Sequence, residues 1–467
     1  MHKNEKQLAT GKISKVLFNL ALPAVTAQIV NVLYNMVDRM YIGHIPDIGR
    51  DALTGIGVCM PLILLISAST ALVSMGGSPR ASIKMGEGKS DEAERILGNC
   101  TSLLVLISVF LTAAFLLFGE WFLLRFGASA NTIVHAMGYM RIYAIGTIFV
   151  QLSLGLNAFI TAQGFAKISM YTVLIGAVSN IILDPIFIFG LKMGVSGAAL
   201  ATIISQGISA IWVVRFLSGP KTVLRIRKEN LRLKAKIILP CLALGMAPFI
   251  MQSTESLIAV CFNSSLLRYG GDLAVGSMTI LTSVMQFSIL PLTGIAQGAQ
   301  PIISYNYGAK NAQRVKEAFQ ALLKASLIYS VIFWLAVMAV PGLFARIFTQ
   351  DTQLIEFTMW SLRIYMACGF LLGIQLACQR TLIAIGNAKA SLFLAILRKI
   401  ILLVPLIYML PHFFENQLFA VFLAEPIADF LAVCATVVLF VRELKKVMRA
   451  LSVELPDENP VLESKAL

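Results

Sequence analysis

The stretch LFNLALPAVTAQIVNVLYNMVDRMYI, residues 17–42, is long and apolar enough to cross a bilayer, yet it carries an acid near its far end. Gln28, Asn31, Asn35 and Asp38 follow one another at spacings of three, four and three residues, so they share one face of a helix. Such a face cannot be turned to lipid, where an ionised or unpaired polar group is costly. We therefore expect the chain to be arranged around an internal cavity into which Asp38 points.

The composition places the chain among helical membrane proteins. Of its 467 residues, 58% are hydrophobic and 13% are charged, against roughly 25% charged in soluble proteins, and the mean hydropathy is +0.81. The net charge of +14 is therefore no sign of nucleic-acid binding. Seven cysteines lie singly in apolar runs, which favours inert thiols over disulfides or a metal site.

Apolar runs of about 20 residues, each sufficient to span roughly 30 Å of hydrocarbon, recur along the whole chain. The predicted spans are 16–42, 52–77, 96–118, 138–162, 168–190, 194–217, 237–265, 274–300, 318–343, 359–385, 389–410 and 416–440. We therefore expect an all-α polytopic membrane protein with twelve transmembrane helices.

The distribution of Lys and Arg predicts how these spans are oriented. One set of connections holds most of the positive charge, including the central stretch SGPKTVLRIRKENLRLKAK at 218–236. The opposite connections hold only Arg50, Arg125, Lys192, Arg268 and Arg346. Since the positive loops of membrane proteins are cytoplasmic, we expect a multi-pass protein of the cell membrane with both termini in the cytoplasm.

The two halves of the chain repeat one another at a constant offset of 222 residues. The tripeptide Arg-Ile-Tyr occurs at 141–143 and again at 363–365, and three residues of another segment recur in the same way, Gly76, Pro79 and Gly86 as Gly298, Pro301 and Gly308. Each half has an even number of spans, so the repeats share one orientation and the pseudo-twofold axis follows the membrane normal. We expect two six-helix bundles, 1–217 and 237–450, with a cytoplasmic linker at 218–236 and a cytoplasmic tail at 451–467.

Each half also carries a glycine-rich segment after its second span, GGSPRASIKMGEGKSDEAERILG from Gly76 and AQGAQPIISYNYGAKNAQRVKEAF from Ala296. These glycines lack the order and the strand context of a phosphate-binding loop, which argues against transport driven by ATP. We expect each segment to contain a helix end followed by a short amphipathic helix.

A second acid lies within a span, Asp184 in SNIILDPIFIFG. Asp38 and Asp184 both come late in spans that run outward, so both are expected in the outer half of the N-terminal bundle. Burial disfavours the charged form of a carboxylate and a second carboxylate nearby disfavours it further, which suits the pair to carry a proton. A structural contact that locks each acid is the alternative. Polar side chains expected around the pair are Ser153, Asn157, Thr161, Thr172, Asn180, Thr202, Gln206 and Ser209.

The second half has its own polar set within its spans: Gln252, Glu255, Asn263, Gln286, Gln375, Gln379, Arg398, Lys399, Glu425 and Asp429. Because acids and bases occur together, a structural salt-bridge network and a substrate or ion site fit this set equally well. The side chains that we expect along a substrate cleft between the bundles are Gln28, Asn31, Tyr34, Asn35, Gln206, Gln252, Glu255, Asn263, Gln286, Gln375, Arg398 and Glu425.

The chain resembles the multidrug and toxic compound extrusion (MATE) family over nearly its whole length. The resemblance lies in LPAVTAQIVNVLYNMVDRMYIG, in ILDPIFIFGLKMGVSGAALATIISQ and in the repeated glycine-rich segments. It implies a two-lobed antiporter that exports organic cations or amphiphilic compounds against an inward gradient of H⁺ or Na⁺. The pocket that such proteins use for ion coupling matches Asp38, Asp184, Asn157, Asn180 and Thr202 here.

One departure from the family pattern concerns the coupling ion. Glu255 resembles an acid of span seven that some members pair with an aspartate of span ten in a sodium site, but this chain has Leu372 and Gly373 in that region. The departure favours the DinF/MepA-like branch over the NorM-like one. We expect H⁺ as the coupling ion, with Na⁺ as the alternative.

Two rival functions belong to other classes. A flippase for a lipid-linked sugar would need a strongly cationic cleft, and an intramembrane enzyme would need a paired nucleophile and base or a metal cluster. The sequence favours neither, so we expect no catalytic residue, no metal and no cofactor. A dedicated exporter of one metabolite remains open. The expected partners are the bilayer and small cationic or amphiphilic molecules, without nucleic acid, and the protein is expected to be a monomer.

Overall fold

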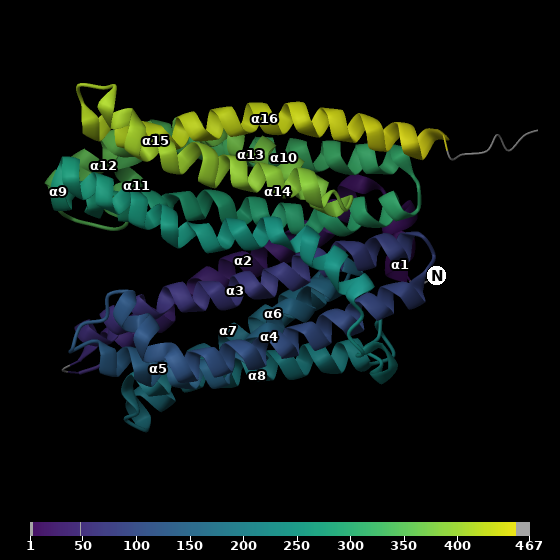
Figure 1. Cartoon of the computed structure of the whole chain (residues 1–467), viewed down its shortest axis with the longest axis horizontal. Coiled ribbons are helices and arrows are strands. Elements are labelled where there is room, and N and C mark those ends of the chain that lie inside the picture. Colours follow the sequence, from purple (N-terminus) through teal and green to yellow (C-terminus); the bar gives the residue numbers. More distant parts are fainter. Residues whose placement is uncertain (1–2, 47, 454–467) are drawn as a thin grey trace, which may run out of the picture.

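The computed structural model describes residues 3–46 and 48–453, and these residues form two bundles of helices (Figure 1). The first bundle consists of α1 (Lys3–Thr10), α2 (Ile13–Gly43), α3 (Gly49–Gly86), α4 (Ser90–Arg125), α5 (Ile133–Ile145), α6 (Thr147–Ala162), α7 (Ala166–Pro185) and α8 (Gly194–Ser218). The second consists of α9 (Ala235–Gly308), α10 (Ala312–Ala339), α11 (Pro341–Arg346), α12 (Thr352–Tyr365), α13 (Leu372–Ala384), α14 (Ala388–Ile396), α15 (Val404–Met409) and α16 (Gln417–Val453). The predicted all-helical membrane fold is confirmed.

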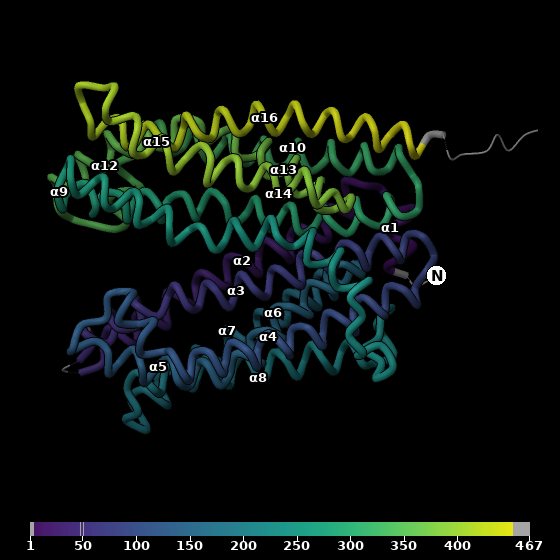
Figure 2. Tube along the Cα trace, viewed as in Figure 1, coloured from purple at the N-terminus to yellow at the C-terminus, as the bar shows by residue number. Residues whose placement is uncertain are grey.

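Twelve spans can be traced within the described residues. Nine helices are long and apolar enough to cross a membrane, and two more spans are pairs of helices bent against each other, α5 with α6 and α12 with α13. One of the nine, α9, contains two spans, because its backbone leaves the helical conformation at Gly271, where φ is 63°. The Cα trace shows the chain turning back near the label of α9 (Figure 2). The tail expected at 451–467 lies mostly outside the described residues, and α16 continues to Val453.

Local signals explain where several helices of the second bundle begin. Asn311 accepts a hydrogen bond from the backbone N–H of Arg314 at the start of α10. Asp351 caps α12 and Asn387 caps α14 in the same way. Asparagine and aspartate side chains satisfy the free N–H groups of a first helical turn, which sets these boundaries.

The internal repeat is visible in the shapes of the helices. The bend between α5 and α6 is 56° and that between α12 and α13 is 49°, and each follows one copy of the Arg-Ile-Tyr tripeptide. A π-helical turn follows α7 at Ile186–Gly190, and a second follows α14 at Leu397–Leu403. The bends therefore occur at equivalent places in the two halves, whereas the π-helical turn of the second half comes earlier in its helix than that of the first.

The glycine-rich segments do contain a helix end, at Gly86 and at Gly308, but the prediction of a short helix after it is wrong, because the long helices α4 and α10 begin there. α3 continues through Gly76 and Pro79 to Gly86, and α9 continues likewise to Gly308. The glycines allow helices of different bundles to pack backbone to backbone: a Cβ atom at Gly86 would overlap the carbonyl of Tyr305, and one at Gly308 would overlap the carbonyl of Ile83. The two contacts are related by the internal repeat, because Tyr305 follows Ile83 by 222 residues and Gly308 follows Gly86 by the same number.

The bundles therefore meet closely at the end of the molecule that holds α1 and spread apart toward the other end (Figure 1). We call the region of close packing around Gly76, Gly86, Gly298 and Gly308 the glycine seam. The end of α16 and the connection between the bundles lie at the same end of the molecule as this seam (Figure 2).

The central connection is bound to the first bundle along most of its length. The side-chain carbonyl of Gln163 accepts hydrogen bonds from Thr222, Val223 and Leu224 at 2.8–2.9 Å. Glu94 forms an ion pair with Arg227 at 2.8 Å. The stretch expected as a linker is thus an ordered layer on the ends of α4 and α6.

Candidate functional site

The main cavity lies in the first bundle and has a volume of about 380 Å³. Helices α2, α3, α6, α7 and α8 form most of its wall, and Gln252, Gln297, Gln300 and Ser304 of α9 cover it from the second bundle. Gln28 Nε2 donates to Gln297 Oε1 at 3.3 Å, which joins the two bundles at the edge of the cavity. A solute in this cavity would therefore contact both bundles.

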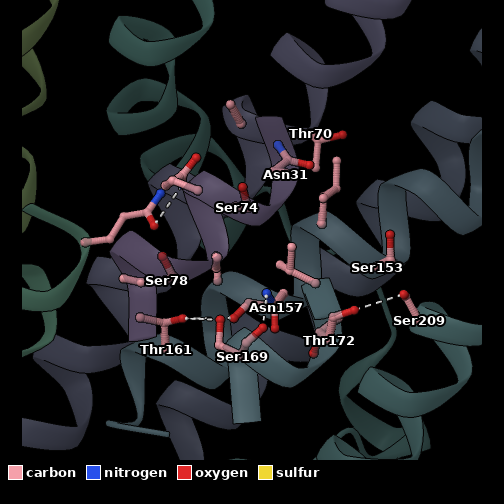
Figure 3. A pocket seen from close by; sticks show the side chains of 18 of the residues that line it. Asn31, Thr70, Ser74, Ser78, Ser153, Asn157, Thr161, Ser169, Thr172 and Ser209 are labelled. Carbon is pink, nitrogen blue, oxygen red and sulfur yellow. Dashed lines mark hydrogen bonds between the residues drawn. The ribbon is translucent and has the colours of Figure 1, made fainter. Parts of the chain in front are cut away.

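The lining of the cavity carries many polar side chains and no charged one among the described residues. It consists of serine, threonine, asparagine and glutamine side chains separated by small apolar ones, and Tyr34 is the aromatic residue among those that form it. On its wall, Thr161 donates to Ser169 at 2.8 Å and Ser209 donates to the carbonyl of Thr172 at 3.0 Å (Figure 3). A cavity of this kind offers many hydrogen bonds and no fixed charge.

The polar face predicted on α2 is divided between the cavity and its surroundings. Gln28 and Asn31 line the cavity, as expected. Asn35 does not: it is exposed, and its amide donates to the carbonyl of Asn31 at 2.6 Å. Asp38 lies one turn further along the helix, next to Asp184.

Asp38 and Asp184 form a pair beyond one end of the cavity. Their carboxyl groups are close enough to interact directly, and α2 runs along α7. Asp184 is completely buried and accepts from Asn180 Nδ2 at 3.2 Å, while the same amide group lies 3.4 Å from Thr202 Oγ1. Asn180 and Thr202 also line the cavity, so they connect the acid pair to it.

Three oxygen atoms at this pair are buried and have no hydrogen-bond donor among the described residues. They are Asp38 Oδ1, Asp184 Oδ2 and Asn180 Oδ1. Arg39 is exposed and contacts the sulfur of Met60 at 3.8 Å. Because buried oxygens without donors are costly, the arrangement is suited to take up a proton or a small cation.

Asn157 is the predicted ion-coupling residue that the structure does not bring to the acids. It lines the cavity, but its amide donates to the carbonyl of Ser169 at 3.2 Å. On the continuous helix α7, Ser169 and Asn180 are 11 residues apart, which at about 1.5 Å per residue corresponds to ~16 Å. Asn157 therefore belongs to the opposite end of the cavity. Gln206, predicted for the cleft, accepts from Ser153 at 2.5 Å and lines the cavity.

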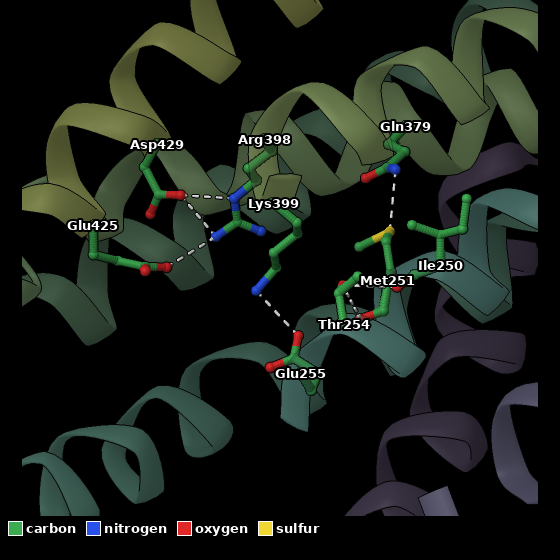
Figure 4. Close-up of polar contacts among 9 residues, drawn as sticks. All are labelled: Ile250, Met251, Thr254, Glu255, Gln379, Arg398, Lys399, Glu425 and Asp429. Carbon is green, nitrogen blue, oxygen red and sulfur yellow. Dashed lines mark hydrogen bonds and ion pairs between the residues drawn. The ribbon is translucent and has the colours of Figure 1, made fainter. Parts of the chain in front are cut away.

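The charged residues of the second bundle form a network of ion pairs (Figure 4). Two nitrogens of the Arg398 guanidinium group each lie 2.7 Å from Oδ1 of Asp429, and one of them lies 3.5 Å from Glu425. Lys399 forms a separate ion pair with Glu255 at 3.1 Å. Of the two alternatives left open above, the structural network is therefore present. Glu255 stands out from the other four, because its side chain is 56% exposed.

The remaining residues predicted for the cleft have different surroundings. Gln252 lines the cavity. Gln375 is buried, and neither polar atom of its side chain has a partner among the described residues. Asn263 and Gln286 are exposed and lie outside the lining of the main cavity.

A row of hydroxyl groups on α3, which was not among the predicted site residues, also lines the cavity. Thr70, Ser74, Ser78 and Ser82 follow one another at intervals of four residues, and all four line the cavity. Side chains four residues apart share one face of a helix, so this row was a recognisable signal. It was missed because hydroxyl groups, unlike acids, are common within membrane helices.

Comparisons with known proteins agree on one family. The family model described as MatE matches residues 23–186 and 247–409, once in each bundle. A protein named multidrug export protein MepA from Staphylococcus aureus (strain N315) is 25% identical over 407 residues, which cover 86% of this chain and 88% of that protein. Its counterpart from Staphylococcus haemolyticus (strain JCSC1435) is 24% identical over 422 residues, or 90% and 92% of the two chains.

Solved structures share the fold. A crystal structure of MATE in a bent conformation has a TM-score of 0.90 and 22% identity and covers 97% of this chain and 100% of that one. A structure described as the outward-facing conformation of a multidrug resistance MATE family transporter has a TM-score of 0.88 and 21% identity, with coverage of 96% and 100%. At these identities the likeness concerns the fold.

Proposed function

Because the chain belongs to the MATE family, whose members are transporters and not enzymes, we propose that it is a multidrug exporter of the MepA type that exchanges organic cations or amphiphilic compounds for H⁺. The observation that carries the proposal is the acid pair Asp38 and Asp184, whose buried oxygens lack donors at one end of a cavity shared by both bundles. The likeness to proteins named as multidrug export proteins supports the class of substrate.

We also propose that the end of the molecule that holds the glycine seam faces the cytoplasm. Arg442, Lys445, Lys446 and Arg449 lie near the end of α16, and the basic connection between the bundles lies at the same end. Positive charge near the ends of spans favours the cytoplasmic side. In this orientation the structure is closed toward the cytoplasm, and the acid pair lies beyond the cavity on the outer side.

The proposed cycle follows from the placement of these groups. Protons that reach Asp38 and Asp184 from outside neutralise the pair and weaken the hydrogen bond that the amide of Asn180 donates to Asp184. Since Asn180 and Thr202 line the cavity, this change alters the hydrogen bonds offered to a bound compound and lowers its affinity. The compound leaves, and the bundles then open toward the cytoplasm, where the protons dissociate. The driving force is the difference in affinity between the two states.

The test uses purified protein in proteoliposomes with ethidium as a fluorescent cation. An imposed pH gradient is expected to drive its accumulation, and an imposed Na⁺ gradient alone is not. Asp38→Asn and Asp184→Asn should each abolish accumulation, because neither amide can carry a proton. Asp51→Asn, which changes an exposed acid at the start of α3, should leave it intact. If a pH gradient drives ethidium accumulation as well in both acid variants as in the unaltered protein, this mechanism is refuted. If only a Na⁺ gradient drives accumulation in the unaltered protein, the proton is not the coupling ion.

A dedicated exporter of one polar metabolite is the second candidate, and the cavity itself favours it. Its lining provides hydroxyl and amide groups with little aromatic surface, which suits an uncharged compound with many hydrogen-bonding groups. The flippase alternative finds less support, because the lining formed by the described residues lacks the basic side chains that a pyrophosphate group requires. Failure of several unrelated cations to bind, together with binding of one neutral metabolite, would favour this second function.

A further inference from the structure

A cationic substrate needs a negative partner, and the main cavity does not supply one among the described residues that line it. Asp38 and Asp184 lie behind Asn180 and Thr202. On α9, however, Glu255 follows Gln252 by three residues, and Gln252 lines the cavity. Glu255 is not among the residues that line the cavity, but residues three apart are neighbours on a helix surface, so its half-exposed side chain lies next to that of Gln252.

In this structure Glu255 is already neutralised from within the second bundle. Its Oε1 lies 3.1 Å from Lys399 Nζ, and the side chain of Lys399 is 9% exposed. The carboxylate is thus the outer member of the ion pair and the ammonium group is the inner one. A cation that arrives from the cavity can compete for Glu255 only if Lys399 finds another negative partner, because an unpaired buried charge is costly.

Glu425 offers that partner. It is 3% exposed, and its Oε2 is buried without a donor among the described residues. Its neighbour Arg398 is held mainly by Asp429, at 2.7 Å from two nitrogens, and lies 3.5 Å from Glu425. Glu425 therefore has an unused acceptor, and Lys399 is near enough for the two charges to interact.

The backbone makes this exchange feasible. Arg398 and Lys399 belong to the π-helical turn Leu397–Leu403, and π-helical turns inside α-helices are frequent at functional sites. Figure 4 shows both side chains directed into the same cluster, with Lys399 reaching Glu255 on one side and Glu425 lying on the other. The four-carbon stem of lysine allows its ammonium group to move between two acceptors while the helix stays in place.

We propose that Glu255 binds the positively charged nitrogen of a transported amine or quaternary ammonium compound, and that Lys399 releases Glu255 by moving to Glu425. The exchange leaves no charge unpaired and adds one ion pair, since the substrate replaces Lys399 at Glu255 and Lys399 fills the free acceptor of Glu425. Glu425 and Lys399 are positioning residues that act through Glu255. The inference rests on the proposed export of cations and names the site that would select them.

The test measures ethidium binding to the purified full-length protein by fluorescence anisotropy. Glu255→Gln removes the acceptor and should weaken binding by about tenfold. Lys399→Met removes the competitor and should strengthen binding. Glu425→Gln leaves Lys399 without its second partner and should weaken binding, although Glu425 does not contact the ligand. Glu443→Gln, on the same helix α16, removes a surface carboxylate paired with Lys446 and serves as the matched control.

The exchange predicts a specific pattern in combined variants. Glu425→Gln should have no further effect in the Lys399→Met background, where nothing has to move, nor in the Glu255→Gln background, where the acceptor is missing. A merely structural role of Glu425 would weaken binding to the same extent in every background, and the second combination remains informative if Lys399→Met does not fold. Unchanged binding in Glu425→Gln would overturn the inference. Absence of ethidium binding and transport in the unaltered protein would instead refute the proposed function.

Discussion

At the scale of single residues, the acids of this protein have two different kinds of surroundings. Asp429 receives two contacts of 2.7 Å from Arg398, so its buried charge is compensated. Asp184 is more deeply buried, but it receives one hydrogen bond, from Asn180, and its Oδ2 has no donor among the described residues. An unsatisfied buried polar group costs about 1–3 kcal/mol, more when it is charged. Asp184 therefore stabilises the fold poorly, which fits a residue whose role is chemical.

The same substitution at these two positions should have opposite effects on stability. Asp184→Asn replaces a poorly compensated carboxyl group by an amide of the same shape that still accepts from Asn180, and should raise the free energy of unfolding by on the order of 1 kcal/mol. Asp429→Asn leaves Arg398 with its weaker partner, Glu425, and should lower the free energy of unfolding by roughly 3 kcal/mol. Thermal unfolding in detergent, followed by tryptophan fluorescence, measures both. A lower midpoint for Asp184→Asn would contradict the argument.

At the scale of helices, the glycine seam determines how closely the bundles can approach. Gly245 and Gly294 extend it: a Cβ atom at Gly245 would overlap the carbonyl of Leu72, and one at Gly294 would meet the backbone of Val25. The backbones of α2 and α3 thus touch α9 without intervening side chains. A contact that depends on missing Cβ atoms exists in one arrangement of the bundles and is lost when they separate.

An alanine in the seam should therefore open this end of the molecule. Gly86→Ala places a methyl group against the carbonyl of Tyr305, whereas Gly57→Ala on the same helix has no atom within 4 Å of the new methyl group. The readout is the alkylation rate of a cysteine that replaces Ser82, which is completely buried and whose hydroxyl donates to the carbonyl of Pro301 at 3.4 Å. The rate should rise several-fold with Gly86→Ala and stay unchanged with Gly57→Ala. Equal rates in the two variants would show that the seam does not control closure.

The helices also show what the sequence could predict. The spans, their bundles and the proximity of Asp38 to Asp184 follow from hydropathy and from the position of each acid along its own helix. The continuation of α3 through Gly76 and Pro79 could not be predicted, since it depends on α9 packing against it. Asn157 was assigned to the ion-coupling pocket through the resemblance to the MATE family, but the stagger of α6 against α7, which no local pattern encodes, places it beside Ser169.

At the scale of the whole molecule, the short helix α1 joins the two bundles. Its Leu8 is 1% exposed and lies next to Gly164 of the first bundle. The carbonyl of Leu8 accepts from Asn306 at 3.0 Å and from Arg314 at 3.1 Å, and the carbonyl of Gly11 accepts from Arg314 at 2.8 Å. Asn306 and Arg314 belong to α9 and α10. The segment before α2 therefore acts as a strap across the closed end, and the bundles cannot separate there without breaking these bonds.

Weakening this strap should favour the state that is open at the α1 end. Arg314→Ala removes both bonds from α10 to the strap, whereas Lys316→Ala removes an exposed charge from the same helix and serves as the control. Each bond to a charged group contributes about 1.5–3 kcal/mol, so even partial loss should increase the population of the open state at least about tenfold. Spin labels are placed at the exposed positions 89 and 313, and the distance between them is measured by double electron–electron resonance. This distance should be longer in Arg314→Ala than in the unaltered protein. The same distance distribution in Arg314→Ala and Lys316→Ala would mean that the glycine seam alone keeps this end closed.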